Sequence, residues 1–131
     1  MINYFTKYKI IFYFSNFILI LEYLFPGSLL GCIFFNNCKI QPQLTADFLI
    51  STNHLYSFLL LSVIGFLTYR NSKKTILLSI YLIIISIFLE FFHKFIPERS
   101  FEVSDLFGNL GGVIIAIIGF NLFKKYENFK N

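Results

Sequence analysis

Acidic, imidazole, guanidinium and amide side chains interrupt the apolar stretches of this chain at only a few positions. Carboxylates and imidazoles can act as general acids and bases, and a guanidinium can hold an anion through paired hydrogen bonds. An ionisable side chain inside an apolar segment is costly, so it needs a partner, water or a function. The candidate site residues are His54, Glu90, His93, Arg99, Asp105 and Asn109.

Two chemistries suit these residues. In the first, Arg99 binds an anionic headgroup or carboxylate, while Glu90, His54 and Asp105 shape the pocket around it. In the second, the protein is a hydrolase or transferase for a lipid-linked substrate, with Glu90 or His54 as general base. Asp105 is a further catalytic candidate. The sequence leaves open whether the protein is an enzyme.

A metal site is the third chemistry to weigh, because Glu90 and His93 have the spacing of a carboxylate–imidazole ligand pair. A soft metal would require Cys32 and Cys38, which lie in a different part of the chain. The chain also contains no Gly-rich phosphate loop and no His-Glu-x-x-His motif. We therefore expect neither a metal nor a cofactor.

The composition predicts what positions these side chains. The 131 residues are 56% hydrophobic and only 14% charged, which suits lipid rather than water as the surrounding solvent. We expect an all-α polytopic membrane protein with four transmembrane helices, each near the ~20 residues that a bilayer requires. Residues 1–131 form one domain, with helices at about 5–25, 48–69, 75–93 and 104–123 and external loops at 26–47 and 94–103.

The basic residues predict the orientation of these helices. They fall in short clusters beside the apolar runs, which is an orientation signal and does not indicate nucleic-acid binding. The clusters precede the first span, separate the second from the third and follow the fourth, so both termini should be cytoplasmic. The eight cytoplasmic cations of the eleven in the chain are Lys7, Lys9, Arg70, Lys73, Lys74, Lys124, Lys125 and Lys130.

Because the rise per residue of a helix is fixed, the number of residues between a polar side chain and the basic cluster gives its depth in the bilayer. His54, Glu90 and Asn109 each lie 15 or 16 residues from the basic cluster at the end of their span. All three therefore lie roughly 22 to 24 Å above the inner charges, just below the outer surface of the bilayer. His93 and Asp105 are one turn higher. We expect the polar residues to meet in a shared pocket that faces outward.

Small residues predict where helices pack. Gly108, Gly112 and Ala116 recur every four residues and form a small-residue ridge that allows another helix to approach closely. The ridge could serve packing within one chain or an oligomer, and the sequence does not decide between them.

The N-terminal half leaves two further questions open. Residues 29–32 resemble the cleavage box of a bacterial lipoprotein signal, but Glu22 and the break at Pro26 fit a retained first span better. Cys32 and Cys38 then lie in one external loop. They could form a disulfide or remain packed thiols.

The segment from Glu90 to Gly112 resembles the VanZ-like family of bacterial membrane proteins. It reads Glu-x-x-His-x-Phe-x-Pro-x-Arg-Ser and then Asp-x-x-x-Asn-x-x-Gly, and His54 also matches a family histidine. The resemblance covers about residues 50 to 120. It departs from the family pattern at His93, where Gln is usual, at Glu98, where Gly is common, and in lacking an Asp-Lys pair just before His54.

This resemblance implies a multi-pass protein of the bacterial cytoplasmic (inner) membrane with a role in the cell envelope. The family is named after a protein associated with low-level resistance to teicoplanin, a lipid-tailed glycopeptide that binds cell-wall precursors. Most members have no assigned activity. The implied partners are the lipid bilayer and an anionic or lipid-linked envelope component, which leaves the particular ligand open.

Overall fold

The computed structural model describes residues 4–131, and this part of the chain is all-helical, as expected. Strands are absent from the described range. The helices are α1 (Tyr4–Leu24), α2 (Leu29–Phe35), α3 (Thr52–Thr68), α4 (Thr75–Phe92) and α5 (Val103–Lys130).

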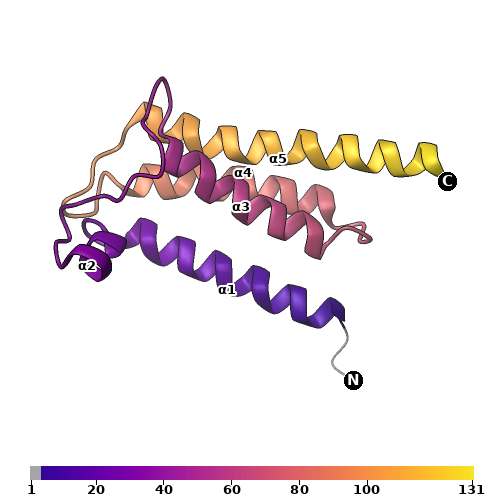
Figure 1. The fold of residues 1–131 in the computed structure, drawn as a ribbon, viewed down its shortest axis with the longest axis horizontal. Coiled ribbons are helices and arrows are strands. Elements are labelled where there is room, and N and C mark those ends of the chain that lie inside the picture. The colour runs from indigo at the N-terminus through magenta and orange to yellow at the C-terminus, as the bar shows by residue number, and fades with distance from the viewer. Residues whose placement is uncertain (1–3) are drawn as a thin grey trace.

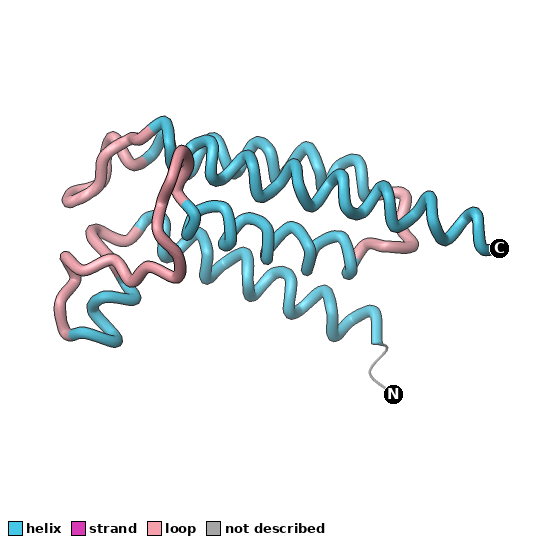
Figure 2. Tube along the Cα trace, turned by 45° about the horizontal axis from the view of Figure 1, so that its top comes forward, coloured by secondary structure: helices cyan, strands magenta, loops and turns pink. Residues whose placement is uncertain are grey.

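Four long helices run side by side along the length of the molecule, and the short helix α2 lies across one end (Figure 1). Helix α5 packs mainly against α3 and also contacts α4, whereas α1 packs against α3 and α4. Most of the loop residues gather at the end that carries α2 (Figure 2), which we call the loop end (residues 25–51 and 93–102). The other end holds the α3–α4 turn and the end of α5.

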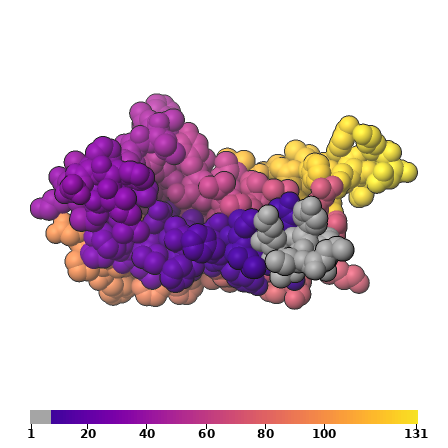
Figure 3. All heavy atoms as spheres, turned by 60° about the horizontal axis from the view of Figure 1, so that its bottom comes forward, coloured from indigo at the N-terminus to yellow at the C-terminus, as the bar shows by residue number. Residues whose placement is uncertain are grey.

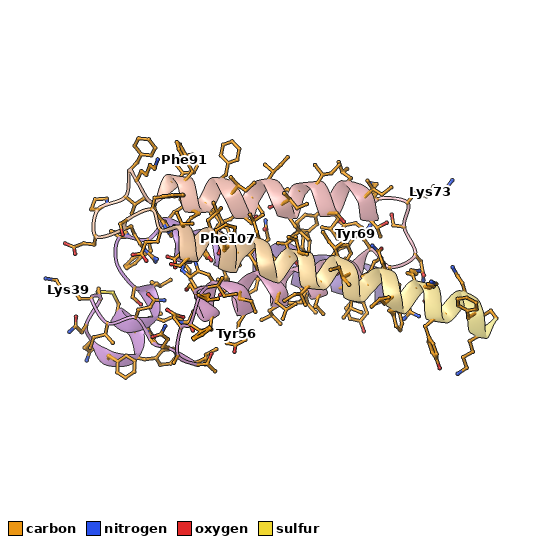
Figure 4. All side chains as sticks on the ribbon, turned by 90° about the horizontal axis from the view of Figure 1, so that it is seen from above. Lys39, Tyr56, Tyr69, Lys73, Phe91 and Phe107 are labelled. Atoms are coloured by element: carbon orange, nitrogen blue, oxygen red, sulfur yellow. A yellow bond between two sulfur atoms is a disulfide. The ribbon has the colours of Figure 1, made fainter. Side chains whose placement is uncertain are left out.

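Basic side chains concentrate at this second end, which we call the basic end (residues 69–74 and 121–131). Lys73 lies there, whereas Lys39 lies at the loop end (Figure 4). The last turns of α5 project beyond the neighbouring helices at the basic end (Figure 3). The start of α1 and the end of α5 thus lie on the same side of the molecule.

The length and composition of the helices allow two to three of them to cross a membrane. Helices α4 and α5 are long and apolar enough individually, and α1 with α2 forms a third candidate that is bent by 90°. Helix α3 is apolar but has only 17 residues. Large side chains such as Ile80, Ile84 and Phe88 are about half exposed on α4. An apolar outer surface of this kind suits contact with lipid.

Two helix boundaries differ from the expected ones. Helix α3 begins at Thr52 because the preceding residues form a loop, in which the Thr52 backbone N–H donates to Asp47 Oδ1 (2.8 Å). That hydrogen bond holds the pKa of Asp47 below its ordinary value. Helix α5 continues seven residues beyond Phe123 to Lys130. This extension contains no Gly or Pro, and Glu127 within it pairs with Arg70.

The expected external loop 26–47 contains the helix α2 and a disulfide. The chain turns sharply at Gly27, whose φ of +84° favours glycine, and Ser28 then caps α2 by accepting a hydrogen bond from Gly31 N (2.9 Å). Cys32 and Cys38 are joined by a disulfide, with their Cα atoms 4.2 Å apart. The loop that the sequence left undefined is therefore cross-linked.

Helix α3 packs directly against the small-residue ridge of α5. A Cβ atom on Gly108 would lie 2.5 Å from the carbonyl oxygen of Ser51, and one on Gly112 would lie 2.7 Å from the backbone nitrogen of Leu59. Ala116 is also buried. The ridge is thus occupied by a helix of the same chain, which brings the beginnings of α3 and α5 together.

Candidate functional site

Polar side chains from four helices form a cluster just inside the loop end. The antiparallel packing of α3 and α5 is fixed there by a hydrogen bond from Ser51 N to the carbonyl oxygen of Ser104 (3.2 Å). Because Gly108 lacks a side chain, the Cβ atom of His54 can lie close to the backbone of α5. The members of this polar cluster are Tyr23 of α1, His54 of α3, Glu90 of α4, His93 just after α4, and Asp105 and Asn109 of α5.

Glu90 is fully enclosed, with no exposed surface. Its Oε1 accepts a hydrogen bond from the backbone N–H of Glu102 (3.1 Å) and lies 3.3 Å from Nδ1 of His93. Its Oε2 lies 3.5 Å from Nδ2 of Asn109. A buried carboxylate with this many donors is held rigidly, because its oxygens cannot move without losing them.

His93 contacts both Glu90 and the backbone of α1. Its Nε2 lies 3.1 Å from the carbonyl oxygen of Tyr23, and a carbonyl can only accept, so Nε2 must carry a hydrogen. The opposite nitrogen, Nδ1, faces Oε1 of the Glu90 carboxylate at 3.3 Å. His93 is 1% exposed, so this pair is a buried link between α1 and the end of α4.

His54 lies between two carboxylates without a hydrogen bond to either. Its Nδ1 is 3.6 Å from Glu90 Oε2, and its Nε2 is 3.6 Å from Asp105 Oδ2. Both distances exceed the usual hydrogen-bond range. Nδ1 is buried and has no hydrogen-bond partner among the residues that the structure describes. The imidazole therefore lies beside two carboxylate oxygens without a hydrogen bond to them.

Tyr23 is the cluster member that the sequence did not predict. Its hydroxyl donates to Asn109 Oδ1 (2.6 Å), and its ring stacks on His93 at 5.5 Å between ring centroids. Tyr23 directly follows Glu22, the acidic residue inside the first expected span, and this neighbour was the one signal that could have found it. Tyrosines are common near membrane surfaces, however, and the residue type alone gave no signal.

Arg99 is anchored to the end of α1. Its Nε donates to the carbonyl oxygen of Phe25 (3.3 Å) and its Nη2 to that of Glu22 (2.9 Å). The last carbonyls of a helix lack intrahelical partners, and Arg99 satisfies two of them. The tight turn at Pro97, where Arg99 N donates to the carbonyl oxygen of Ile96 (3.2 Å), directs the chain back toward α1.

A pocket of about 360 Å³ opens beside this cluster at the loop end. His54 and Tyr23 belong to both the cluster and the pocket wall, whereas Glu90 does not line the pocket. The wall combines one guanidinium with several amides and one carboxyl group. We call this cavity the outer pocket. Its polar lining residues include Glu22, Gln41, Gln43, Asn53, His54 and Arg99.

The fold and the site define an all-helical protein that two to three helices could hold in a membrane, with a buried polar cluster beneath a pocket at one end. Comparison of the chain with the models of known protein families, with curated proteins and with solved structures found no match.

The hydrogen bond between Tyr23 and Asn109 allows a test of the cluster. Tyr23→Phe should lower the free energy of unfolding by about 1–3 kcal/mol, because Asn109 Oδ1 would then be buried without a donor. Tyr56→Phe removes a hydroxyl that bonds Thr45 in an exposed position, and it should cost no more than about 0.5 kcal/mol. Thermal unfolding in detergent, followed by circular dichroism, would measure both. Equal shifts for the two variants would contradict the assignment.

Proposed function

We propose that this chain is a VanZ-like protein of the bacterial cytoplasmic membrane, with α1, α3, α4 and α5 as four spans and both termini in the cytoplasm. The side-by-side arrangement of the four long helices supports this proposal (Figure 1). So does the gathering of cationic side chains at the basic end, since such residues are retained on the cytoplasmic side. On this orientation the loop end and the outer pocket face the cell exterior.

The disulfide between Cys32 and Cys38 supports the same orientation. Disulfides persist in oxidising surroundings, such as the outside of a bacterial cytoplasmic membrane, and are rare in the cytosol. In intact cells, both cysteines should react with a membrane-impermeant maleimide only after a membrane-impermeant reductant has been added. Labelling that requires cell lysis would place the loop end in the cytosol and overturn the orientation.

Within this class, we infer that the outer pocket binds an anionic or lipid-linked envelope component and thereby alters susceptibility to glycopeptides such as teicoplanin. The observation that carries this inference is the lining of one pocket by Arg99 together with His54 and polar amides. A guanidinium is suited to phosphate and carboxylate groups, and the surrounding amides can bond their remaining oxygens. The pocket lies at the end where envelope precursors would be met.

Arg99 also connects the α4–α5 loop to α1, so its geometry as well as its charge should matter. Arg99→Lys retains the charge, but an ammonium lacks the planar guanidinium that can bond two carbonyl oxygens and a ligand at the same time. In a bacterium that expresses the protein, this variant should return teicoplanin susceptibility to the level of cells without it. Glu90→Gln, which removes the charge at the centre of the cluster, should do the same.

The matched control is Arg70→Lys at the basic end, where the arginine pairs with Glu127 far from the outer pocket. It should retain the wild-type susceptibility, with membrane levels of every variant compared by immunoblot. Two results would overturn the proposal: wild-type protein that leaves glycopeptide susceptibility unchanged, or full activity of Arg99→Lys at equal expression.

A membrane-embedded hydrolase or transferase is the second candidate, and the position of His54 favours it. His54 lines the outer pocket and lies against Asp105, whereas Glu90 is enclosed and cannot contact a ligand there. The general base would therefore be Nε2 of His54, with Glu90 on the side of the buried Nδ1 orienting the ring. Purified protein should then turn over a lipid-linked phosphate substrate, and His54→Gln should abolish that turnover. Absence of turnover by the wild-type protein would reject this candidate.

A further inference from the structure

We propose that His54, Glu90 and Asp105 form a binding site for one divalent cation that accepts mixed nitrogen and oxygen ligands, of the Zn²⁺ or Mn²⁺ type. Each residue offers one ligand atom, and these atoms lie within 4.8 Å of one another. They come from three different helices, α3, α4 and α5. The sequence showed only the Glu90 and His93 pair, which is too little for a metal site.

In the tertiary structure, His54 and not His93 has a nitrogen free to bind a metal. Nε2 of His93 is bonded to the carbonyl oxygen of Tyr23 and its Nδ1 to Glu90, so both of its nitrogens are occupied. His54 is 3.6 Å from each carboxylate, and its buried Nδ1 has no hydrogen-bond partner among residues 4–131. An imidazole with an unbonded nitrogen beside two carboxylates offers the ligand types of a cation site, and one ligand atom from each residue lies within 4.8 Å of the others.

The distances fit a cation after small side-chain rotations. Around a four-coordinate zinc ion with bonds of about 2.0–2.1 Å, neighbouring ligand atoms lie roughly 3.3 Å apart. Only one ring nitrogen of His54 can bind a given ion, and its 3.6 Å separation from one carboxylate oxygen is close to this value. The third ligand atom, within 4.8 Å, must then move closer to the ion. His54 and Asp105 side chains are 12% and 19% exposed, so they can adjust more readily than Glu90, which is fully enclosed.

The groups behind Glu90 are of the kind that orient a metal ligand. Glu90 Oε1 is held by the Glu102 N–H and by His93, which leaves Oε2 directed toward His54. Such outer hydrogen bonds orient a ligand and are a regular part of protein metal sites. His54 lines the outer pocket, which provides an entry path for the ion.

The ligand set selects the class of metal. Cys32 and Cys38 are consumed in a disulfide, so the site offers one imidazole and two carboxylates and no thiolate. Imidazole nitrogen suits Zn²⁺ and its neighbours, whereas Mg²⁺ and Ca²⁺ prefer oxygen ligands alone. Three protein ligands leave at least one coordination position for water or an anion.

The charge of the cluster favours a cation as well. Glu90 and Asp105 place two carboxyl groups within 3.6 Å of His54. A divalent ion would compensate these charges in surroundings where an unpaired carboxylate is costly. The competing arrangement is a protonated His54 that bridges the two carboxylates without a metal. This proposal does not depend on the envelope role, because it concerns binding of the ion alone.

Metal binding to the purified full chain tests the proposal directly. The protein should carry an affinity tag without histidine, be treated with EDTA and then be titrated with Zn²⁺ in competition with a chromogenic chelator. One ion per chain is expected, and His54→Gln and Asp105→Asn should each lower the affinity at least about tenfold. The matched control, Asp47→Asn, alters a carboxylate that bonds Thr52 outside the cluster, and it should bind as the wild type does.

Electron paramagnetic resonance with Mn²⁺ as the probe identifies the ligand. The wild-type complex should show electron-spin-echo modulation from an imidazole nitrogen, and His54→Gln should lose it while retaining the wild-type circular dichroism spectrum. Two results would overturn the proposal: no ion of either kind retained at micromolar free metal, or unchanged affinity in both His54→Gln and Asp105→Asn. Either result would leave His54 beside the two carboxylates without an ion.

Discussion

Gly112→Ala is expected to lower the free energy of unfolding by about 2–3 kcal/mol, the upper part of the range for overpacked cores. The added Cβ would meet the carbonyl oxygen of Leu55, would lie 2.7 Å from the nitrogen of Leu59 and would lie 3.2 Å from the carbonyl carbon of Phe58. All three are backbone atoms of α3, which cannot rotate out of the way as a side chain can. The helices must separate, and the separation would also displace His54 from the polar cluster.

Gly119→Ala on the same helix is the matched control. No described atom lies within 4 Å of the position of its added Cβ. Alanine is favoured over glycine in a helix by roughly 0.5–1 kcal/mol, so this variant should unfold at the same or a slightly higher temperature. Thermal unfolding in detergent, followed by circular dichroism, measures both variants. A Gly112→Ala protein that unfolds together with Gly119→Ala would contradict the packing of α3 on the ridge.

Glu90→Ala should be the most damaging change in the polar cluster, with an expected cost of about 3–5 kcal/mol. The substitution removes the acceptor of the Glu102 N–H and the partner of His93, and both groups remain buried or partly buried. Uncompensated polar and charged groups away from water account for most of that cost. We expect a strongly reduced melting temperature and poor recovery from membranes.

Two further variants distinguish the effect of the Glu90 charge from a general loss of stability. Glu90→Gln keeps an oxygen that can accept from Glu102 N, so it should recover a large part of the lost stability while still abolishing the proposed activity. Glu98→Ala removes an exposed carboxylate in the nearby loop and should change stability by no more than about 0.5 kcal/mol. If Glu90→Ala were as stable as Glu98→Ala, the enclosed position of Glu90 would be wrong.

The convergence of His54, Glu90 and Asn109 followed from the sequence because the rise of a helix per residue is fixed. Counting from the basic clusters gave all three the same height, and the structure places them in one cluster. The small size of Gly108 and Gly112 likewise indicated where α5 would accept a neighbour. Height and small-residue spacing are local properties, so they can be obtained without knowledge of the partner helix.

Which residues of different helices contact one another could not be predicted in this way. The hydroxyl of Tyr23 bonds an amide 86 residues further along the chain. Arg99 bonds one carbonyl of α1 and one just after it, 77 and 74 residues earlier. Such contacts depend on how far each helix is rotated about its own axis. In a chain this apolar, large aliphatic and aromatic side chains point both inward and outward, so their periodicity does not define that rotation.

The amino-acid sequence alone thus determined the helical class, the apolar character of the helices, the segregation of basic residues and the level of the polar side chains, because each follows from composition and helix geometry. Only the tertiary structure decided that Cys32 and Cys38 are joined, that Tyr23 belongs to the cluster and that His54, not His93, lies between Glu90 and Asp105. The physical reason is that hydrogen bonds and ligand geometry change with differences of a few tenths of an ångström in the distances between helices. Backbone packing, such as that of α3 on Gly112, sets these distances.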